Sequence, residues 1–212
     1  MKHLTLIISI LICSNLIGQN LETRLAEKIR VELFNRLDSL SIEHPTRVSC
    51  IDRSAQHQST FLINNPTILG HRQYELMNGK QSIGDTIIKN PSTRVYVFCD
   101  TLLKFTAEII YSSFYSDTTK LLNKLPSDVI KGFIGSKDHK EIMDSHHEFY
   151  GIGVRFKRSD EYPSLIDAVV TITYGGNFLI FNNTYPKHFT INTTSRIKFR
   201  QECEKNIVIR NN

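Results

Sequence analysis

The sequence lacks tryptophan, and after residue 20 it has no long apolar segment. The second absence excludes a membrane-spanning helix from that part of the chain, because a span needs roughly 20 consecutive apolar residues. Internal repeats and low-complexity segments are also missing, which excludes a repeat architecture. A chain of 212 residues without these features fits one globular domain with a full-sized core.

A strong excess of one charge is missing too. There are 26 basic residues, and without Lys2, which belongs to the leader described next, 25 remain against 21 acidic residues, a net charge of +4. The basic residues are spread along the sequence, apart from a cluster at residues 155–158 and the C-terminal tail. This distribution is typical of an ordinary solvated surface, so we expect no nucleic-acid partner.

Residues 1–18 have the composition of a secretory signal peptide. A short basic start precedes the almost unbroken apolar run 4–17, and Gly18 offers a small residue for cleavage. The run is too short for a comfortable membrane span, and the bulky Ile12 before Cys13 argues against a lipid anchor. We therefore expect a secreted or periplasmic protein with no transmembrane segment in the mature chain.

Cleavage there would leave Cys50, Cys99 and Cys203. An odd number of cysteines cannot all pair within one chain, so at most one internal disulfide forms. A Cys50–Cys99 bridge is one possibility in an oxidising compartment, and the sequence does not decide the pairing.

The first half of the chain has the apolar periodicity of helices separated by a long loop. Residues 21–40 repeat leucine and isoleucine at helical spacing after Asn20, a suitable N-cap. A second helix is predicted from Val48 to Leu62. The polar, glycine-bearing segment 66–91 is predicted to be a long loop over one face, a position typical of functional residues.

The middle of the chain is predicted to contain a strand at 94–98 and a helix at 102–114. Another helix is predicted to start after Pro126, and a short one follows the turn at Ser136. His57 is interpreted as a surface residue of the second helix, and His146-His147-Glu148 as a solvated turn.

The last third alternates apolar and polar residues, as strands do. Segments 152–157 and 170–174 predict an antiparallel pair, and Gly151 and Gly153 indicate a strand that passes close to another element. Helices first and antiparallel strands last point to an α+β domain.

The segment 132–154 resembles the signature of the CAP superfamily, the SCP domain of cysteine-rich secretory proteins, in its bacterial form. In that family a helix ends in an aromatic-x-x-Ser-x-x-His unit and leads to an Ile-Gly-Val-Gly strand. The matching residues here are Phe133, Ser136, His139, Met143 and the strand residues 152–154. Arg155 stands where a second glycine is usual, and Phe133 stands in a helix that usually carries tryptophan.

Weaker matches occur in the order that the family has them. Arg30 fits the Asn-x-x-Arg of the opening helix, although Glu27 replaces the asparagine. His71 follows the second helix at the distance of the family's first cleft histidine. Glu108 matches the cleft glutamate of a Gly-Glu-Asn motif whose glycine and asparagine are replaced here. The family's second cleft glutamate has no clear match, and Ser136 stands near its place.

The resemblance covers about residues 21–176 and implies a three-layer α-β-α sandwich with a mainly antiparallel sheet. It divides the chain into a signal peptide at 1–18, a CAP/SCP-like domain at 19–176 and a β-rich C-terminal extension at 177–212.

The resemblance also implies one cleft lined by His71, Glu108, Ser136 and His139. Two imidazoles and a carboxylate, His71, Glu108 and His139, form a ligand set suited to Zn²⁺ or a similar divalent ion. Alternatively, both histidines are polar residues lining a groove and Glu108 holds its helix to a loop. Ser136 is interpreted as a helix cap whose oxygen accepts backbone N–H bonds, rather than as a nucleophile.

Three functions follow from these features. The first is a secreted CAP/SCP-domain protein that binds a small molecule, lipid, ion or protein surface without turnover, as most members of the family do. The second is a metal-dependent extracellular hydrolase acting on peptide or envelope material. In the third the cleft is vestigial and the β-rich tail is an interaction module.

Overall fold

The computed structural model of the chain describes residues 2–66, 70–71, 75–77, 80–82, 90–100 and 102–179. It divides into two compact units, one of residues 25–179 and one of residues 1–24 and 180–212. The first unit contains every element of the central sheet. Most of the predicted β-rich extension at 177–212 lies outside the described residues.

Helix α1 (Lys2–Ser39) is one continuous helix. The helix predicted at 21–40 is confirmed, but the predicted start at Asn20 is wrong because the helix runs through this residue. Its inner face is buried at helical spacing by Leu25, Ile29, Leu33 and Leu37. None of the helices in the described part of the chain combines the length and apolar character needed to cross a membrane.

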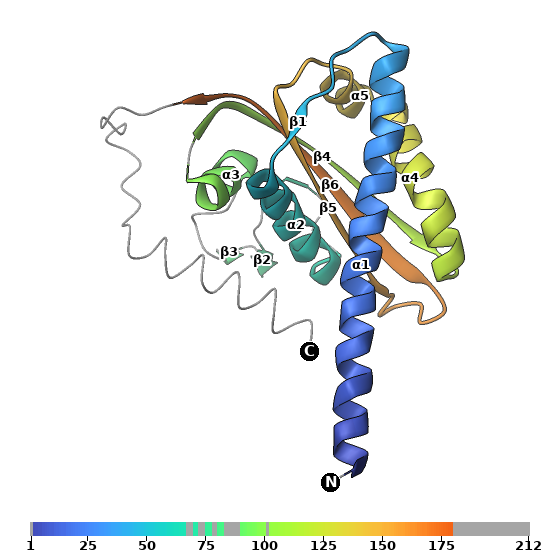
Figure 1. The fold of residues 1–212 in the computed structure, drawn as a ribbon. Coiled ribbons are helices and arrows are strands. Elements are labelled where there is room, and N and C mark those ends of the chain that lie inside the picture. Colours follow the sequence, from blue (N-terminus) through green and yellow to red (C-terminus); the bar gives the residue numbers. More distant parts are fainter. Residues whose placement is uncertain are drawn as a thin grey trace. The chain divides into compact units, whose positions relative to one another are not determined.

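The central sheet has four strands in the order β1-β5-β6-β4 (Figure 1). Strand β1 (Thr46–Arg47) pairs in parallel with β5 (Phe149–Arg158). Strand β6 (Ile166–Leu179) pairs antiparallel with β5 on one side and with β4 (Leu102–Tyr115) on the other. Strands β2 (Glu75–Met77) and β3 (Lys80–Ser82) form a separate hairpin. The sheet is therefore mixed but mainly antiparallel, and β4 is an edge strand.

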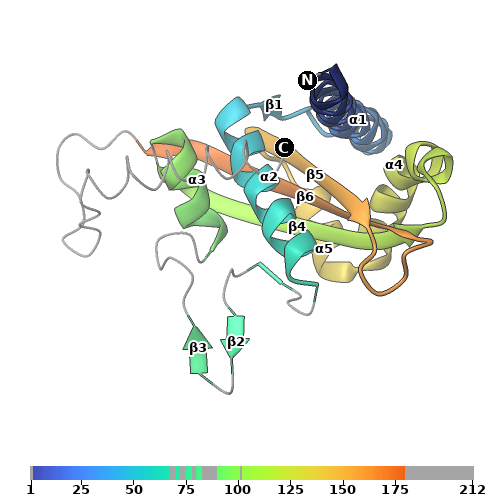
Figure 2. The ribbon, with the colours of Figure 1, turned by 90° about the horizontal axis from the view of Figure 1, so that it is seen from below.

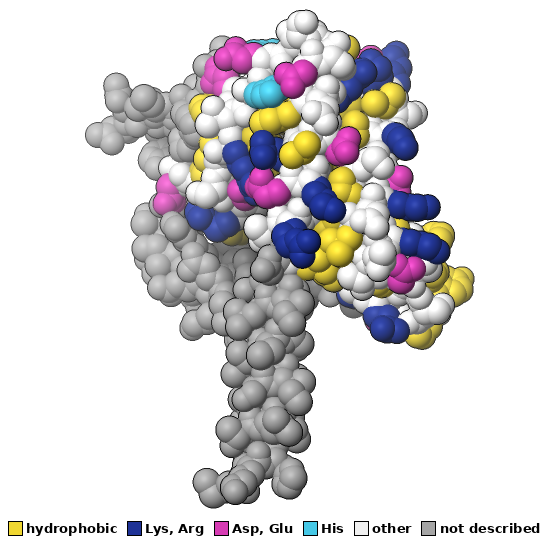
Figure 3. Space-filling model, turned by 45° about the vertical axis from the view of Figure 1, so that its right-hand side comes forward, with side chains coloured by type: hydrophobic (Ala, Val, Ile, Leu, Met, Phe, Trp, Pro, Cys, Tyr) yellow, Lys and Arg dark blue, Asp and Glu magenta, His cyan; other side chains and the backbone are white. Residues whose placement is uncertain are grey.

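Helices cover both faces of this sheet. Helix α2 (Ser49–Asn64) crosses one face and α3 (Pro91–Cys99) packs against α2 and β4. On the other face, α1 and α4 (Thr118–Gly135) lie side by side (Figures 1 and 2), and α5 (Lys137–Met143) follows. The predicted α+β class and α-β-α sandwich are confirmed. On the face shown in Figure 3, lysine and arginine side chains are interspersed with apolar and acidic ones.

Alternation along β5 separates the two faces. The Tyr150 ring lies 5.7 Å from the Phe34 ring of α1, whereas Gly151 and Gly153 face α2. A Cβ atom at Gly153 would lie 2.3 Å from the backbone carbon of Ala55. The close approach predicted for these glycines is confirmed, because only hydrogen fits between the strand and the helix backbone.

Replacing Gly153 by alanine is expected to lower the free energy of unfolding by about 1–3 kcal/mol, because the new methyl group forces α2 away from the sheet. Urea denaturation measures the change. Gly135→Ala is the control, since its Cβ would meet nothing within 4 Å. Equal stability of the two variants would show that α2 does not sit this close to β5.

Two middle elements differ from their predictions. Residues 94–98, predicted as a strand, lie in α3, and residues 102–114, predicted as a helix, form β4. Helix α4 begins at Thr118, where the Asp117 side chain accepts a hydrogen bond from the Lys120 amide at 2.7 Å. The predicted start after Pro126 is wrong, because this proline lies inside the helix.

Candidate functional site

The site is built around Glu108 in the middle of the edge strand β4. This residue faces the side of the sheet covered by α2, opposite Thr173 of β6. Its side chain is 0% exposed. The Thr173 hydroxyl donates to Oε2 of Glu108 at 3.3 Å. A buried carboxylate needs a compensating charge and hydrogen-bond donors, and most of these come from one arginine.

Arg94 of α3 supplies the compensating charge. Its side chain is fully buried, and its Nη2 lies 2.7 and 2.6 Å from the two carboxylate oxygens of Glu108. Its Nη1 donates to the main-chain carbonyl of His71 at 3.1 Å. One guanidinium therefore fixes both the carboxylate and the backbone that carries the first histidine.

Sequence reasoning missed Arg94 because it placed residues 94–98 in a strand. A signal for the helix was present in the run Asn90-Pro91-Ser92-Thr93. The Asn90 side chain accepts from the Thr93 amide, the Thr93 hydroxyl receives a bond from the Asn90 amide, and Pro91 occupies the first turn. Such a capping box with an early proline is typical of a helix start.

His71 lies at the mouth of the site with 42% of its side chain exposed. Its Nδ1 is 3.2 Å from Oε1 of Glu108. A carboxylate only accepts hydrogen bonds, so this contact favours the tautomer with the proton on Nδ1. The lone pair of the ring is then on Nε2, where it can bind a cation.

His139 reaches the same place from the opposite face of the sheet. It lies on α5, its ring packs edge-on at 5.5 Å against Phe133, and its centroid is 6.4 Å from that of His71. The two histidines meet because β4 is the edge strand and groups from both faces can converge beyond it. Partial burial and the neighbouring His71 lower the pKa of His139 below its usual range.

Ser136, the fourth predicted cleft residue, occupies the junction between α4 and α5. Its backbone carbonyl accepts from the Lys140 amide at 2.8 Å, but its hydroxyl makes no capping hydrogen bond. The predicted cap bond is therefore wrong. The structure brings His71, Glu108 and His139 together, and no described contact joins Ser136 to them.

The fit of the three residues to a metal depends on Glu108. Both of its oxygens are already held by Arg94, so little of its charge is available to a cation. Within the described residues, no group of three or more His, Cys, Asp or Glu side chains is arranged to hold a metal. Among the described residues, no hydrogen bond is made by Nε2 of His71 or by the His139 ring. The two imidazoles therefore fit a cation better than the carboxylate does.

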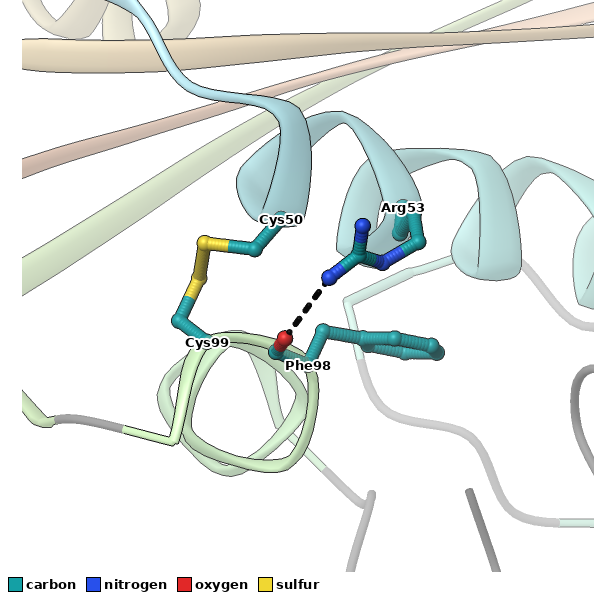
Figure 4. The surroundings of a disulfide bond; sticks show 4 residues. All are labelled: Cys50, Arg53, Phe98 and Cys99. Atoms are coloured by element: carbon teal, nitrogen blue, oxygen red, sulfur yellow. Dashed lines mark hydrogen bonds between the residues drawn. A yellow bond between two sulfur atoms is a disulfide. The ribbon is translucent and has the colours of Figure 1, made fainter. Parts of the chain in front are cut away.

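A disulfide links α3, and hence Arg94, to α2. Cys50 and Cys99 are bonded with their Cα atoms 5.0 Å apart, which establishes the pairing that the sequence left open. Beside the bond, Nη2 of Arg53 donates to the Phe98 carbonyl at 3.1 Å (Figure 4). A disulfide of this kind is consistent with a location outside the cytoplasm.

His57 lies half-buried in α2, not on the surface as predicted, with its ring 5.6 Å from that of Phe98. Burial, together with the positive charge of Arg94, lowers the pKa of His57 from 6.5 to about 4. The unfolded chain therefore takes up a proton at a higher pH than the folded protein, and stability falls as the pH drops from about 6.5 toward 4.

Replacing His57 by glutamine is expected to remove this part of the acid sensitivity. The difference in unfolding free energy between pH 7 and pH 5 should shrink by about 1–2 kcal/mol relative to the wild type. Urea denaturation at the two pH values measures it. The same loss in both proteins would mean that His57 is as easily protonated in the folded state as in the unfolded chain.

His147 also differs from its prediction as part of a solvated turn. It is 5% exposed, and its ring stacks against Tyr174 at 4.3 Å and Phe105 at 5.5 Å. Its Nε2 lies 2.6 Å from the Ile142 carbonyl, so this nitrogen carries the proton. His147 is a packed residue that ties the end of α5 to the sheet, whereas His146 is exposed.

No protein-family model and no curated protein matches the chain. The solved structures that resemble it include the following two. An outer surface protein from Borrelia burgdorferi has a TM-score of 0.50 at 16% identity, over 71% of this chain and 91% of that one. An extracellular protein containing an SCP domain from Bacillus anthracis has a TM-score of 0.50 at 11% identity, over 76% of this chain and 42% of that one.

The chain thus spans less than half the length of the Bacillus protein and nearly the whole length of the Borrelia protein. At these identities the similarity is one of fold. It agrees with the resemblance in the sequence around His139 and with the observed layers. The chain shares its α-β-α fold with part of an extracellular bacterial protein that contains an SCP (CAP) domain.

Proposed function

We propose that the chain is an exported SCP-type binding protein whose ligand site is the cluster of His71, Glu108 and His139 at the edge of β4. Export would follow cleavage of the signal peptide near Gly18. The observation that carries the proposal is the contact of the His71 ring with both Glu108 and His139. Ionisable groups from separate segments that meet in an accessible place mark a candidate functional site.

In this proposal the cluster holds a divalent cation such as Zn²⁺ through the two histidines. Glu108 would orient His71 from behind by accepting its Nδ1 proton, an arrangement common around metal-bound histidines. A cation bound there would offer open positions to a donor atom of a small molecule, lipid or protein. The proposal therefore assigns Glu108 a positioning role, because Arg94 already occupies both of its oxygens.

Binding without turnover is favoured over metal-dependent hydrolysis by the contacts of Glu108 with Arg94 and Thr173. A hydrolase that used Glu108, the carboxylate of the cluster, as its general base would need this residue to accept a proton from water. Its position between Arg94 and Thr173 leaves its oxygens occupied.

Isothermal titration of the protein with Zn²⁺ tests the proposal. Loss of a residue that only supports a metal ligand costs about 10–100-fold in affinity. We expect His71→Ala and His139→Ala each to weaken Zn²⁺ binding by at least this much, because each removes one of two protein ligands. His146→Ala is the matched control, since His146 is an exposed histidine near α5, and its affinity should equal that of the wild type. Equal affinities in all four proteins, or no binding by any of them, would contradict the proposed site.

A further inference from the structure

Apart from the histidine cluster, a pocket lies on the α2 face of the sheet, at the C-terminal end of α2. Its volume is about 530 Å³, within the range of sites that hold a ligand of several side chains or a drug-sized molecule. Leu62 and Ile63 of α2 form one wall, and Ile110 and Val169 of the sheet form the floor. The pocket is therefore apolar at its base.

Two exposed aromatic side chains line this pocket. Phe114 at the end of β4 is 66% exposed, and Tyr162 in the turn between β5 and β6 is 55% exposed. These are the two most exposed large apolar side chains among the described residues. A partner that covers large exposed rings beside an apolar pocket removes apolar surface from water, which favours binding.

The pocket also borders β4, the edge strand of the sheet. Ser112, Ser113 and Phe114 are consecutive residues of β4, and all three line it. By the alternation of side chains along the strand, Ser112 and Phe114 face the α2 side of the sheet, as Glu108 does, so the pocket lies on that face beside the end of β4. Among the described strands β4 pairs only with β6, so its other edge presents N–H and C=O groups that can pair with another strand.

The charge at the pocket has one sign. Asp160, Glu161 and Asp167 line it, and no lysine or arginine is among its described lining residues. Lys157 is the cross-strand neighbour of Asp167, but its ammonium pairs with Asp160. Within the described residues Asp167 makes no ion pair, and it is half-buried. A partner that brings a basic side chain to Asp167 would gain a partly desolvated ion pair.

We propose that the edge of β4 and this pocket form a docking site for an extended peptide. The peptide adds to the sheet as a strand beside residues 112–114, places an apolar side chain in the pocket, and sets a lysine or arginine near Asp167. Main-chain hydrogen bonds to the edge supply affinity for any sequence, and the pocket and carboxylates select the side chains. None of the three residues of the histidine cluster lines this pocket, although Gly70 next to His71 does, and the docking does not require a metal.

Selection from a random heptapeptide library displayed on phage tests this proposal. The library is panned on the purified protein after depletion on the Phe114→Ser variant. We expect enrichment of apolar residues at alternate positions with a lysine or arginine at one end. The strongest peptide, made with a fluorescent label, should bind Phe114→Ser and Asp167→Asn at least about tenfold more weakly than the wild type.

Three controls separate the parts of the site. Val31→Ser removes an exposed apolar residue of α1, and Glu43→Gln removes an exposed carboxylate, and neither should change the affinity. His71→Ala should also bind the peptide normally, so failure of the metal proposal would leave this proposal intact.

N-methylation of the peptide tests strand pairing. Two peptides are made, with N-methyl groups on one or the other set of alternate amides. One of the two should bind with at least about tenfold lower affinity, because strand pairing needs the amide hydrogens of one set.

Three results would overturn the proposal. They are no enrichment above the depleted library, equal binding to the wild type and Phe114→Ser, and full affinity of both N-methylated peptides. The last result would identify the pocket as a site for isolated side chains or small apolar molecules, with no added strand.

Discussion

Arg94→Met is expected to lower the free energy of unfolding by about 3–5 kcal/mol. The substitution leaves the Glu108 carboxylate buried without its counter-charge, and removing one partner of a buried ion pair is strongly destabilising. It also removes the hydrogen bond to the His71 carbonyl, so Zn²⁺ binding at the cluster should weaken as well. Urea denaturation and calorimetric titration measure the two effects.

The double variant Arg94→Met/Glu108→Met separates stability from binding. Replacing both members of a buried ion pair by apolar residues of similar size is often neutral or stabilising. We therefore expect the double variant to regain most of the lost stability, while Zn²⁺ binding stays weak because His71 has lost its orienting carboxylate. A double variant that is less stable than Arg94→Met would show that the pair does not act as a unit.

The second large effect is expected from the disulfide. Cys50→Ser/Cys99→Ser should lower the free energy of unfolding by about 2–4 kcal/mol, because the bond closes a loop between residues separated by 49 positions. The loss should be accompanied by weaker Zn²⁺ binding, since the bond holds α3, and with it Arg94, against α2. Thermal or urea unfolding of the two proteins measures the change in stability.

Cys203→Ser is the matched control, because Cys203 is not part of the observed bond. It should unfold as the wild type does, and adding a thiol reductant should lower the stability of this control to that of the double serine variant. A control that is as unstable as the double variant before reduction would indicate that Cys203 takes part in a stabilising bond.

The elements predicted correctly are those whose local pattern fits a single structure. Helix α1 repeats apolar residues every three or four positions over several turns, and α2 ends where Asn65-Pro66 makes continuation unfavourable. The glycines of β5 correctly predict a close approach, because glycine weakens a strand and is tolerated there mainly where a neighbouring backbone takes the place of the side chain. In each case the information lies within a few residues of the element.

Strand β4 is predicted as a helix because Leu102, Thr106, Ile109 and Ile110 also fit helical spacing. Its β-branched and aromatic residues favour a strand, but the decision comes from pairing with β6, whose residues lie more than 50 positions away. This pairing depends on the tertiary fold, so the spacing of apolar residues within 102–114 does not reveal it.

The candidate site is only partly accessible from the sequence for the same reason. His71, Glu108 and His139 come from the resemblance to a known family, and the structure places them together. Arg94 is missed, because its role depends on α3 lying beside β4, and the residues around it are predicted as a strand. An arginine that neutralises a buried glutamate is visible only once both elements are in place.

The most direct test of the site is a Zn²⁺ titration of ¹⁵N-labelled protein, followed through the histidine ring nitrogens. We expect the signals of Nε2 of His71 and of one ring nitrogen of His139 to shift together and to saturate at the same amount of added Zn²⁺. Throughout the titration Nδ1 of His71 should keep the signal of a protonated nitrogen, held by Glu108. Shifts confined to other histidines, or loss of the Nδ1 proton of His71, would contradict the account.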